Sequence, residues 1–101
     1  MDLGYFYLDG HKPVRTDDVR LWAEKFFTQD RTVDYTPIAT EISVSTVFLG
    51  TDHNYHDDGP PLLFQTLVFG GAMDGGMERY ATWDEAVEGH KAMVKRVKGA
   101  L

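Results

Sequence analysis

The sequence contains no cysteine among its 101 residues. This absence excludes disulfide bonds, thiolate zinc sites, iron–sulfur clusters and a cysteine nucleophile, and it is compatible with a reducing cytoplasm. Basic residues are also few, because 10 Lys and Arg stand against 16 Asp and Glu, which gives a net charge of −6. Since general nucleic-acid binding depends on basic side chains that neutralise phosphates, we expect no direct contact with nucleic acid.

Long hydrophobic runs are absent as well. No stretch approaches the roughly 20 apolar residues that a membrane-spanning helix needs, so we expect no membrane partner. Residues 1–10 lack the basic segment and apolar run of a signal peptide. The length predicts a single domain over residues 1–101, and such a domain can bury one core without a metal or a disulfide.

Two segments have the periodicity of amphipathic helices. Over residues 17–28, apolar side chains recur at helical spacing between Val19 and Phe27, and Thr16 is the expected N-cap. The second helix is expected over residues 83–98, with its apolar stripe beginning at Trp83. This pattern predicts two helices that each bury one face against a sheet.

The second helix has clear signals at both ends. Thr82 and Glu85 have the spacing of a capping box. Acidic residues fill the first turns and basic residues the last, which complements the helix dipole and explains the basic C-terminal segment. Gly99 is expected as the left-handed residue that follows the helix.

Strand patterns supply the rest of the predicted fold. They cover residues 4–8, 32–36, 41–49, 62–69 and 77–81. The last three follow one another through loops, which favours an antiparallel meander, and residues 62–69 are apolar on both faces, as in a central strand. We therefore predict an α+β fold with two layers, in which a mainly antiparallel sheet of about four to five strands is packed by two amphipathic helices.

The segment over residues 50–61 invites a functional interpretation. Its candidate partner-binding residues carry imidazole, carboxylate or phenol groups: Asp52, His53, Tyr55, His56, Asp57 and Asp58. Imidazoles and carboxylates bind zinc, manganese or iron, yet this spacing matches no established metal motif. Asp, Asn, Gly and Pro equally favour a solvated turn. A solvated loop and a partner-binding surface both remain open, and we predict neither a metal nor another cofactor.

Other residues that could carry chemistry favour a structural role. His90 lies on the apolar stripe of the second helix, where a histidine is usually a core residue with satisfied ring nitrogens. The glycine-rich residues 69–76 lack the Lys-Ser/Thr pair of a phosphate-binding loop. Ser43 and Ser45 lie in a strand without the glycines of a nucleophile elbow. We therefore predict no catalytic residue.

Several motifs occur in a specific order over residues 42–97. They are STVFLG at 45–50, DH at 52–53, GPPLLFQTLVFG at 59–70, ERYATWDEA at 78–86 and GH at 89–90. In this order the chain resembles a family of small uncharacterised proteins encoded by tailed bacteriophages and prophages. The resemblance implies a phage origin and action in the cytoplasm of the infected host. It implies no activity, cofactor or catalytic residue.

We predict from these observations a small phage accessory protein that binds a host or phage protein and does not catalyse a reaction. One alternative is a small metal-dependent enzyme that uses Asp52, His53 and His56, with His90 as a further candidate. Another is an acidic inhibitor that mimics nucleic acid, although the acids are scattered along the chain. A homodimer is also expected, because aromatic residues make up 13% of the chain and few charges protect the edge of residues 4–8.

Overall fold

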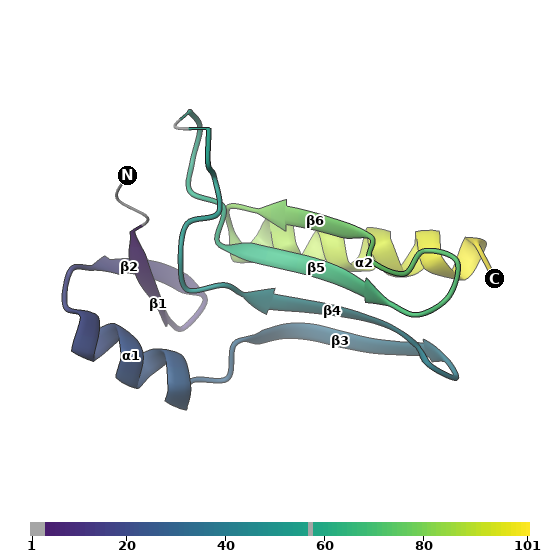
Figure 1. The fold of residues 1–101 in the computed structure, drawn as a ribbon, viewed down its shortest axis with the longest axis horizontal. Helices are drawn as coiled ribbons and strands as arrows, with labels where there is room; N and C mark the ends of the chain where they lie inside the picture. The colour runs from purple at the N-terminus through teal and green to yellow at the C-terminus, as the bar shows by residue number, and fades with distance from the viewer. Residues whose placement is uncertain (1–3, 57) are drawn as a thin grey trace.

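A computed structural model describes residues 4–56 and 58–101, in which two strands precede the first helix and four further strands precede the second. The elements are β1 (Tyr5–Asp9), β2 (Lys12–Thr16), α1 (Val19–Thr28), β3 (Thr32–Ala39), β4 (Ile42–Phe48), β5 (Phe64–Phe69), β6 (Met77–Tyr80) and α2 (Trp83–Gly99) (Figure 1). They form one two-stranded and one four-stranded sheet, both antiparallel. The predicted α+β fold class is confirmed.

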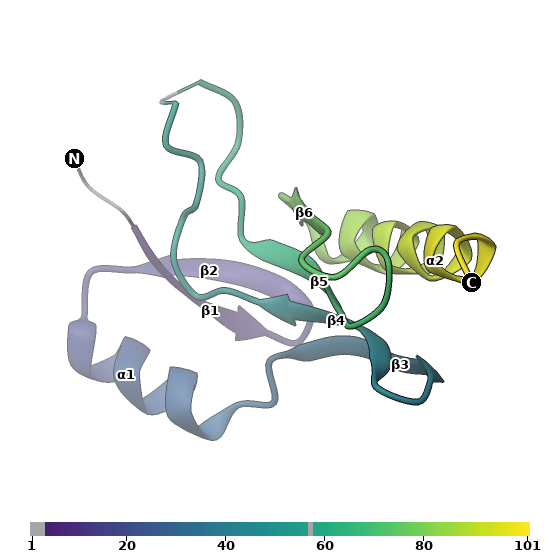
Figure 2. The same ribbon diagram turned by 45° about the vertical axis from the view of Figure 1, so that its right-hand side comes forward.

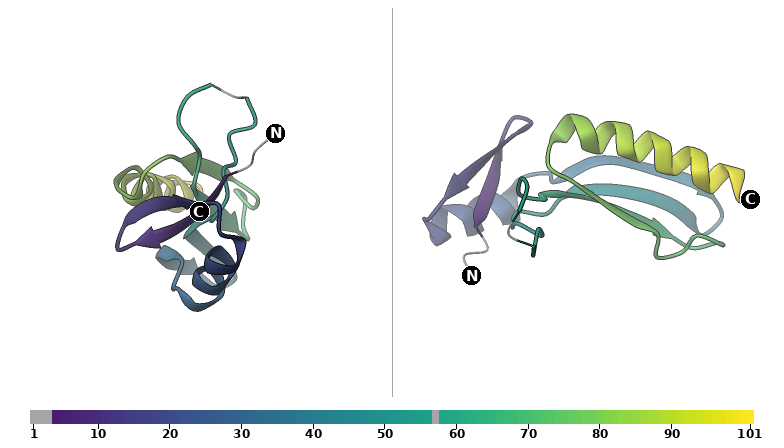
Figure 3. Two further views of the ribbon diagram at one scale, coloured as in Figure 1. Left: turned by 90° about the vertical axis from the view of Figure 1, so that its left-hand side faces the viewer. Right: turned by 90° about the horizontal axis from the view of Figure 1, so that it is seen from above.

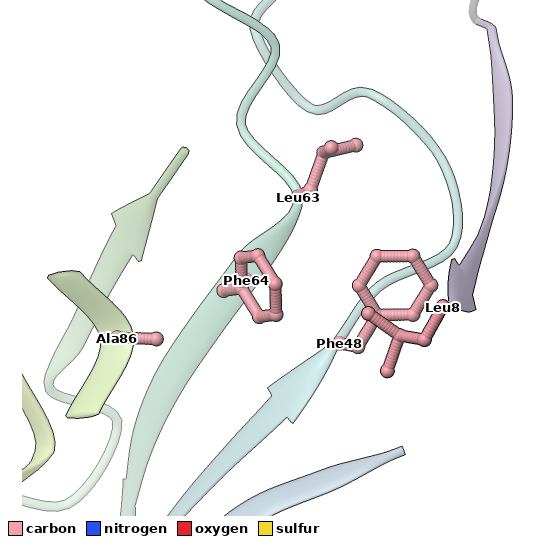
Figure 4. Packing of buried hydrophobic residues seen from close by; sticks show 5 residues of the cluster. All are labelled: Leu8, Phe48, Leu63, Phe64 and Ala86. Atoms are coloured by element: carbon pink, nitrogen blue, oxygen red, sulfur yellow. The ribbon is translucent and has the colours of Figure 1, made fainter. Parts of the chain in front are cut away.

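The four-stranded sheet is a meander in the order β3-β4-β5-β6, and α2 covers one of its faces (Figures 1 and 3). β5 lies between β4 and β6, the central position that its apolar pattern predicts. Buried side chains form two clusters. One contains Leu8, Phe48, Leu63, Phe64 and Ala86 (Figure 4), and the other contains Val44, Val68, Met93 and Val97.

The first helix does not pack on the four-stranded sheet, in contrast to the prediction. It lies against the β1–β2 hairpin, and none of its side chains is buried. Hairpin and helix form one end of a molecule that measures 44 × 30 × 20 Å (Figure 3). Leu8 connects this end to the main core, and the indole N–H of Trp22 donates to the carbonyl of Gly50 at 2.9 Å.

Strand β2 was not predicted, because Pro13 and its charged neighbours break the usual strand pattern. Pro13 is accommodated there because β2 pairs only with β1, so its missing N–H costs no ladder bond on the other side. β3 likewise continues beyond its predicted end and contains Pro37. It is the edge strand of its sheet, and its register with β4 shifts next to that proline.

The beginning of α1 also differs from the prediction. The helix starts at Val19, and its N-cap is Asp18, whose carboxylate accepts the N–H groups of Arg20 and Leu21, each at 3.1 Å. Thr16 instead accepts the N–H of Asp18 at 3.0 Å. The prediction of Thr16 as the cap is therefore wrong by two residues, because either side chain can accept such a bond and only the backbone path selects between them.

Helix α2 begins as predicted, with the Thr82 hydroxyl accepting the N–H of Glu85 at 3.1 Å. The Glu85 carboxylate accepts from the Thr82 hydroxyl and not from its backbone N–H, so the capping box is half formed. At the other end the prediction is wrong, because Gly99 is the last helical residue and Ala100 is the cap. The N–H of Ala100 bonds to the carbonyl of Val97, which closes the last turn without a left-handed residue.

The middle of α2 lies very close to β6. The Tyr80 side chain packs against the helix backbone at Gly89, and a Cβ at this position would overlap the Tyr80 ring. Glycine is unfavourable inside a helix, so its presence here has a packing reason. This contact fixes the distance between the helix and the sheet.

Candidate binding loop

The segment between β4 and β5 projects from the end of the sheet (Figure 2). Its base continues the pairing of the two strands, because the N–H of Leu49 donates to the carbonyl of Leu63 at 2.7 Å and that of His53 donates to Leu62 at 2.9 Å. The Asp52 carboxylate accepts the N–H of Asn54 at 2.7 Å and that of Leu62 at 3.0 Å. One carboxylate thus ties the two sides of the base together.

In the described part of the loop tip, the Asn54 side chain bonds to the backbone of three other residues. The Asn54 side-chain NH₂ donates to the carbonyls of Asp58 and Pro60, and its oxygen accepts the N–H of His56 at 3.2 Å. Asn54 was not among the predicted site residues. Its role follows from the ability of Asn to bond to nearby backbone, which the sequence indicated only as a general turn signal.

The predicted candidates divide into two groups in this loop. Tyr55, His56 and Asp58 are exposed, with 53% of the Tyr55 side chain accessible. Asp52 and His53 are half-buried at the base. The remaining candidate, Asp57, lies outside the residues that the structure describes.

The described residues contain no group of three or more His, Cys, Asp or Glu that could hold a metal ion. The Nδ1 atom of His53 lies 2.9 Å from the carbonyl of Thr51. Because a carbonyl can only accept, this nitrogen carries the proton and only Nε2 remains as a ligand atom. His90 lies over the middle of the sheet and bonds to strand residues there, so it does not join the loop.

His90 is a buried core residue, as predicted, with 1% of its surface exposed. Its Nδ1 atom lies 2.7 Å from the hydroxyl of Thr46, and its Nε2 atom lies 2.8 Å from that of Thr36. The Thr46 hydroxyl also bonds to that of Thr66 at 2.6 Å. Burial lowers the pKa of His90 below 6.5, an effect that the nearby Asp34 carboxylate, 3.6 Å from Nε2, partly opposes.

The partners of His90 were missed because they depend on the register of three strands. Thr46 and Thr66 face each other across β4 and β5 and are both fully buried. Each threonine lies on the face of its strand that packs against α2, between two buried apolar residues. A polar residue at such a position was the only sign in the sequence that His90 has partners on these strands. The two threonines and His90 separate the two apolar clusters of the core.

A further feature without a sequence signal lies between the β1–β2 turn and the start of α2. The rings of His11 and Trp83 stack there, with centroids 3.8 Å apart and planes 4° from parallel. They border an open hollow of about 430 Å³. Asp9, Lys12 and Asp84 also line the hollow, so its charges are of both signs.

Neither helix in the described part of the chain combines the length and the apolarity that crossing a membrane would require. Comparisons of this chain with models of protein families, with curated proteins and with solved structures find no match.

Proposed function

We propose that this chain is a small accessory protein of a tailed bacteriophage that binds another protein in the cytoplasm of the infected host, without catalysing a reaction. The loop at residues 50–61 is the part that contacts the partner. The observation that carries this proposal concerns the described part of the loop, residues 50–56 and 58–61, where hydrogen bonds of Asp52 and Asn54 tie down the backbone beside exposed Tyr55, His56 and Asp58.

A loop with a fixed shape loses little conformational entropy when it binds, which increases affinity. Tyrosine supplies a large contact area with a polar end, and it is enriched at protein interfaces. The net charge of −6 favours a partner whose contact surface is basic, because complementary charge speeds association and selects the partner.

The arrangement of the histidines supports a role without catalysis. Both ring nitrogens of His90 are bonded to threonine hydroxyls beneath α2. In the loop, Nδ1 of His53 is bonded to a backbone carbonyl. A general base must reach a substrate proton, and the two bonds of buried His90 leave neither of its ring nitrogens free to do so.

The test compares tagged copies expressed in the bacterial host, with captured proteins measured by quantitative mass spectrometry. The loop variant is Tyr55→Ala/His56→Ala, and its matched control is Lys91→Ala/Lys95→Ala, which removes two exposed side chains from α2. We expect one or more proteins captured by the wild type and the control to fall at least about tenfold with the loop variant. Equal capture by all three proteins would refute the assignment of the loop.

A second variant tests whether the shape of the loop matters. Asn54→Ala removes the bonds to Asp58 and Pro60 but leaves Tyr55 and His56 in place. We expect weaker binding to the purified partner in calorimetry, because the loop must then be ordered on binding. Binding unchanged by Asn54→Ala would show that the fixed backbone is not what the partner recognises.

A further inference from the structure

The face of the four-stranded sheet opposite α2 has no covering element among the described residues. Figure 1 looks onto this face, and α2 lies behind the sheet. In antiparallel sheets, residues that pair directly share a face. The register therefore places three rows on the open side: Thr32, Val47, Gln65 and Arg79; Tyr35, Ser45, Leu67 and Met77; and Pro37, Ser43 and Phe69.

The composition of this open face differs from that of a surface made only for water. Arg79 is its single charged residue, although 26% of the chain is charged. The outer side of α2 shows the contrast, because it carries exposed Glu88, Lys91 and Lys95. Large apolar side chains are also exposed on the open face, at 56% for Tyr35, 47% for Phe69 and 45% for Met77.

We infer that this open face is the interface of a reversible homodimer, in which the four-stranded sheets of two copies pack against each other and the two α2 helices lie outside. The first argument is charge. A partner of strong charge gains nothing from a face that holds one charged residue, whereas two copies of a chain with net charge −6 can approach closely only where their acids are absent.

The second argument is the distribution of side-chain size. The open side of β4 carries small Ser43 and Ser45, and the open side of β5 carries larger Leu67 and Phe69. A twofold axis along the seam between these strands places β4 of one copy opposite β5 of the other. Small residues then lie against large ones across the interface, as close packing of two sheets requires.

The same twofold axis also separates the two positive charges. It places β6 of one copy opposite β3 of the other, so Arg79 faces Thr32 and not a second Arg79. The side-chain amide of Gln65 already accepts a bond from Arg79 at 3.0 Å, which holds the guanidinium along the sheet. Met77 lies opposite Tyr35 in this arrangement.

The area of the open face indicates how tightly two copies are expected to bind each other. Four strands about 4.8 Å apart and about six residues long give a projected area of about 400 Å² per copy. Two copies bury about 800 Å² in total, which is less than the roughly 1,200 Å² of the smallest stable interfaces and falls in the range of weak, transient association. The dimer is therefore expected to form at micromolar to millimolar protein concentration.

Sedimentation equilibrium of the untagged protein tests this inference. We expect the average mass to rise from 11.4 kDa toward twice that value between about 5 µM and about 500 µM. Ser45→Lys and Phe69→Lys each place a charge on the open face and should raise the dissociation constant at least about tenfold. Ala92→Lys, on the exposed side of α2, should leave it within about twofold.

Circular dichroism is used to check that each variant is folded, and two charged variants are used so that one misfolded protein does not decide the result. A wild type that stays monomeric at the highest concentration overturns the inference. So does a dimer that both open-face variants leave intact, because another surface, such as the edge of β3, would then hold the copies together.

The orientation has its own test because the chain lacks cysteine. A mixture of Ser45→Cys and Leu67→Cys proteins, treated with a short crosslinker for thiols, should give more heterodimer than either protein mixed with Ala92→Cys. Equal yields would contradict the packing of β4 against β5. The loop variant Tyr55→Ala/His56→Ala should dimerise normally, so this inference and the proposed function fail independently.

Discussion

Replacement of Thr46 by valine probes the buried polar row of the core. The two side chains have nearly the same shape, so the substitution removes one hydroxyl without opening a cavity. This hydroxyl bonds to Nδ1 of His90 at 2.7 Å and to the hydroxyl of Thr66 at 2.6 Å. Thr46 and Thr66 are fully buried and His90 is 1% exposed, so water cannot replace the lost partner.

The expected loss of stability comes from two groups that lose their hydrogen-bond partner, the Thr66 hydroxyl and Nδ1 of His90. Leaving a buried polar group unsatisfied costs about 1–3 kcal/mol, and the added methyl group of Thr46→Val returns about 0.8 kcal/mol. For the two groups together, we expect the free energy of unfolding to fall by about 1–5 kcal/mol. This loss would leave most domains of this size folded, because their stability is about 5–15 kcal/mol.

The double variant Thr46→Val/Thr66→Val makes the test more specific. It removes the unsatisfied Thr66 hydroxyl, so its destabilisation should be smaller than the sum of the single variants by at least about 1 kcal/mol. Urea unfolding at pH 7.5, followed by circular dichroism and by tryptophan fluorescence, measures all three. Thr32→Val, an exposed threonine on β3, is the control and should change stability by less than about 0.5 kcal/mol. A loss below this value for Thr46→Val, or additive single effects, would refute the network.

Four other expectations concern α2 and the loop. Since burial lowers the pKa of His90 below 6.5, the unfolded chain binds a proton that the folded chain does not, so stability should fall as pH drops through 6.5. Urea unfolding at pH 7.5 and 5.5 should show a smaller fall for His90→Gln, and equal falls would contradict this origin. Gly89→Ala should destabilise by more than about 2 kcal/mol although alanine favours helices, because the new Cβ meets Tyr80; a stabilised variant would refute the contact. Thr82→Ala should cost about 1 kcal/mol, and Trp83→Ala should cost more, about 2–3 kcal/mol, because its half-buried ring packs on the core; equal losses would be inconsistent with this. Excess zinc, manganese or calcium should shift the melting temperature by less than about 2 °C, and a larger shift in calorimetry would support a metal site in the loop.

Strong local signals explain which elements the sequence predicted. α2 combines a capping threonine, an apolar stripe and a charge gradient, so three independent features agree on its start. The strand patterns of β4 and β5 are also long: over six or more residues, apolar side chains either alternate with polar ones or follow one another. By contrast, β2 consists of five residues with Pro13 among them, and it forms because the two-residue turn at Gly10 and His11 brings it beside β1.

The candidate site was predictable only as a segment. The composition of residues 50–61 indicated a polar turn with exposed groups, and Tyr55 and His56 are exposed. Which side chains hold the backbone and which face solvent depends on the path of the chain, so Asp52 and Asn54 could not be separated from the others. The partners of His90 could not be predicted for a similar reason. A shift of one residue in the strand pairing would turn different side chains toward the helix, and the sequence alone does not fix this register.

The threonine row beneath His90 also affects which pairings of the sheet are tolerated. A slip of β5 by two residues along β4 keeps the same faces inside, but it places Thr66 opposite Val44 or Phe48. The Thr66 hydroxyl would then be buried without its partner, and the Thr46 hydroxyl would keep only its bond to His90, whereas an apolar row would accept the slip at little cost. The threonine row thus helps to select the register of the sheet. It does so by destabilising sheets with the wrong register more than by stabilising the correct one.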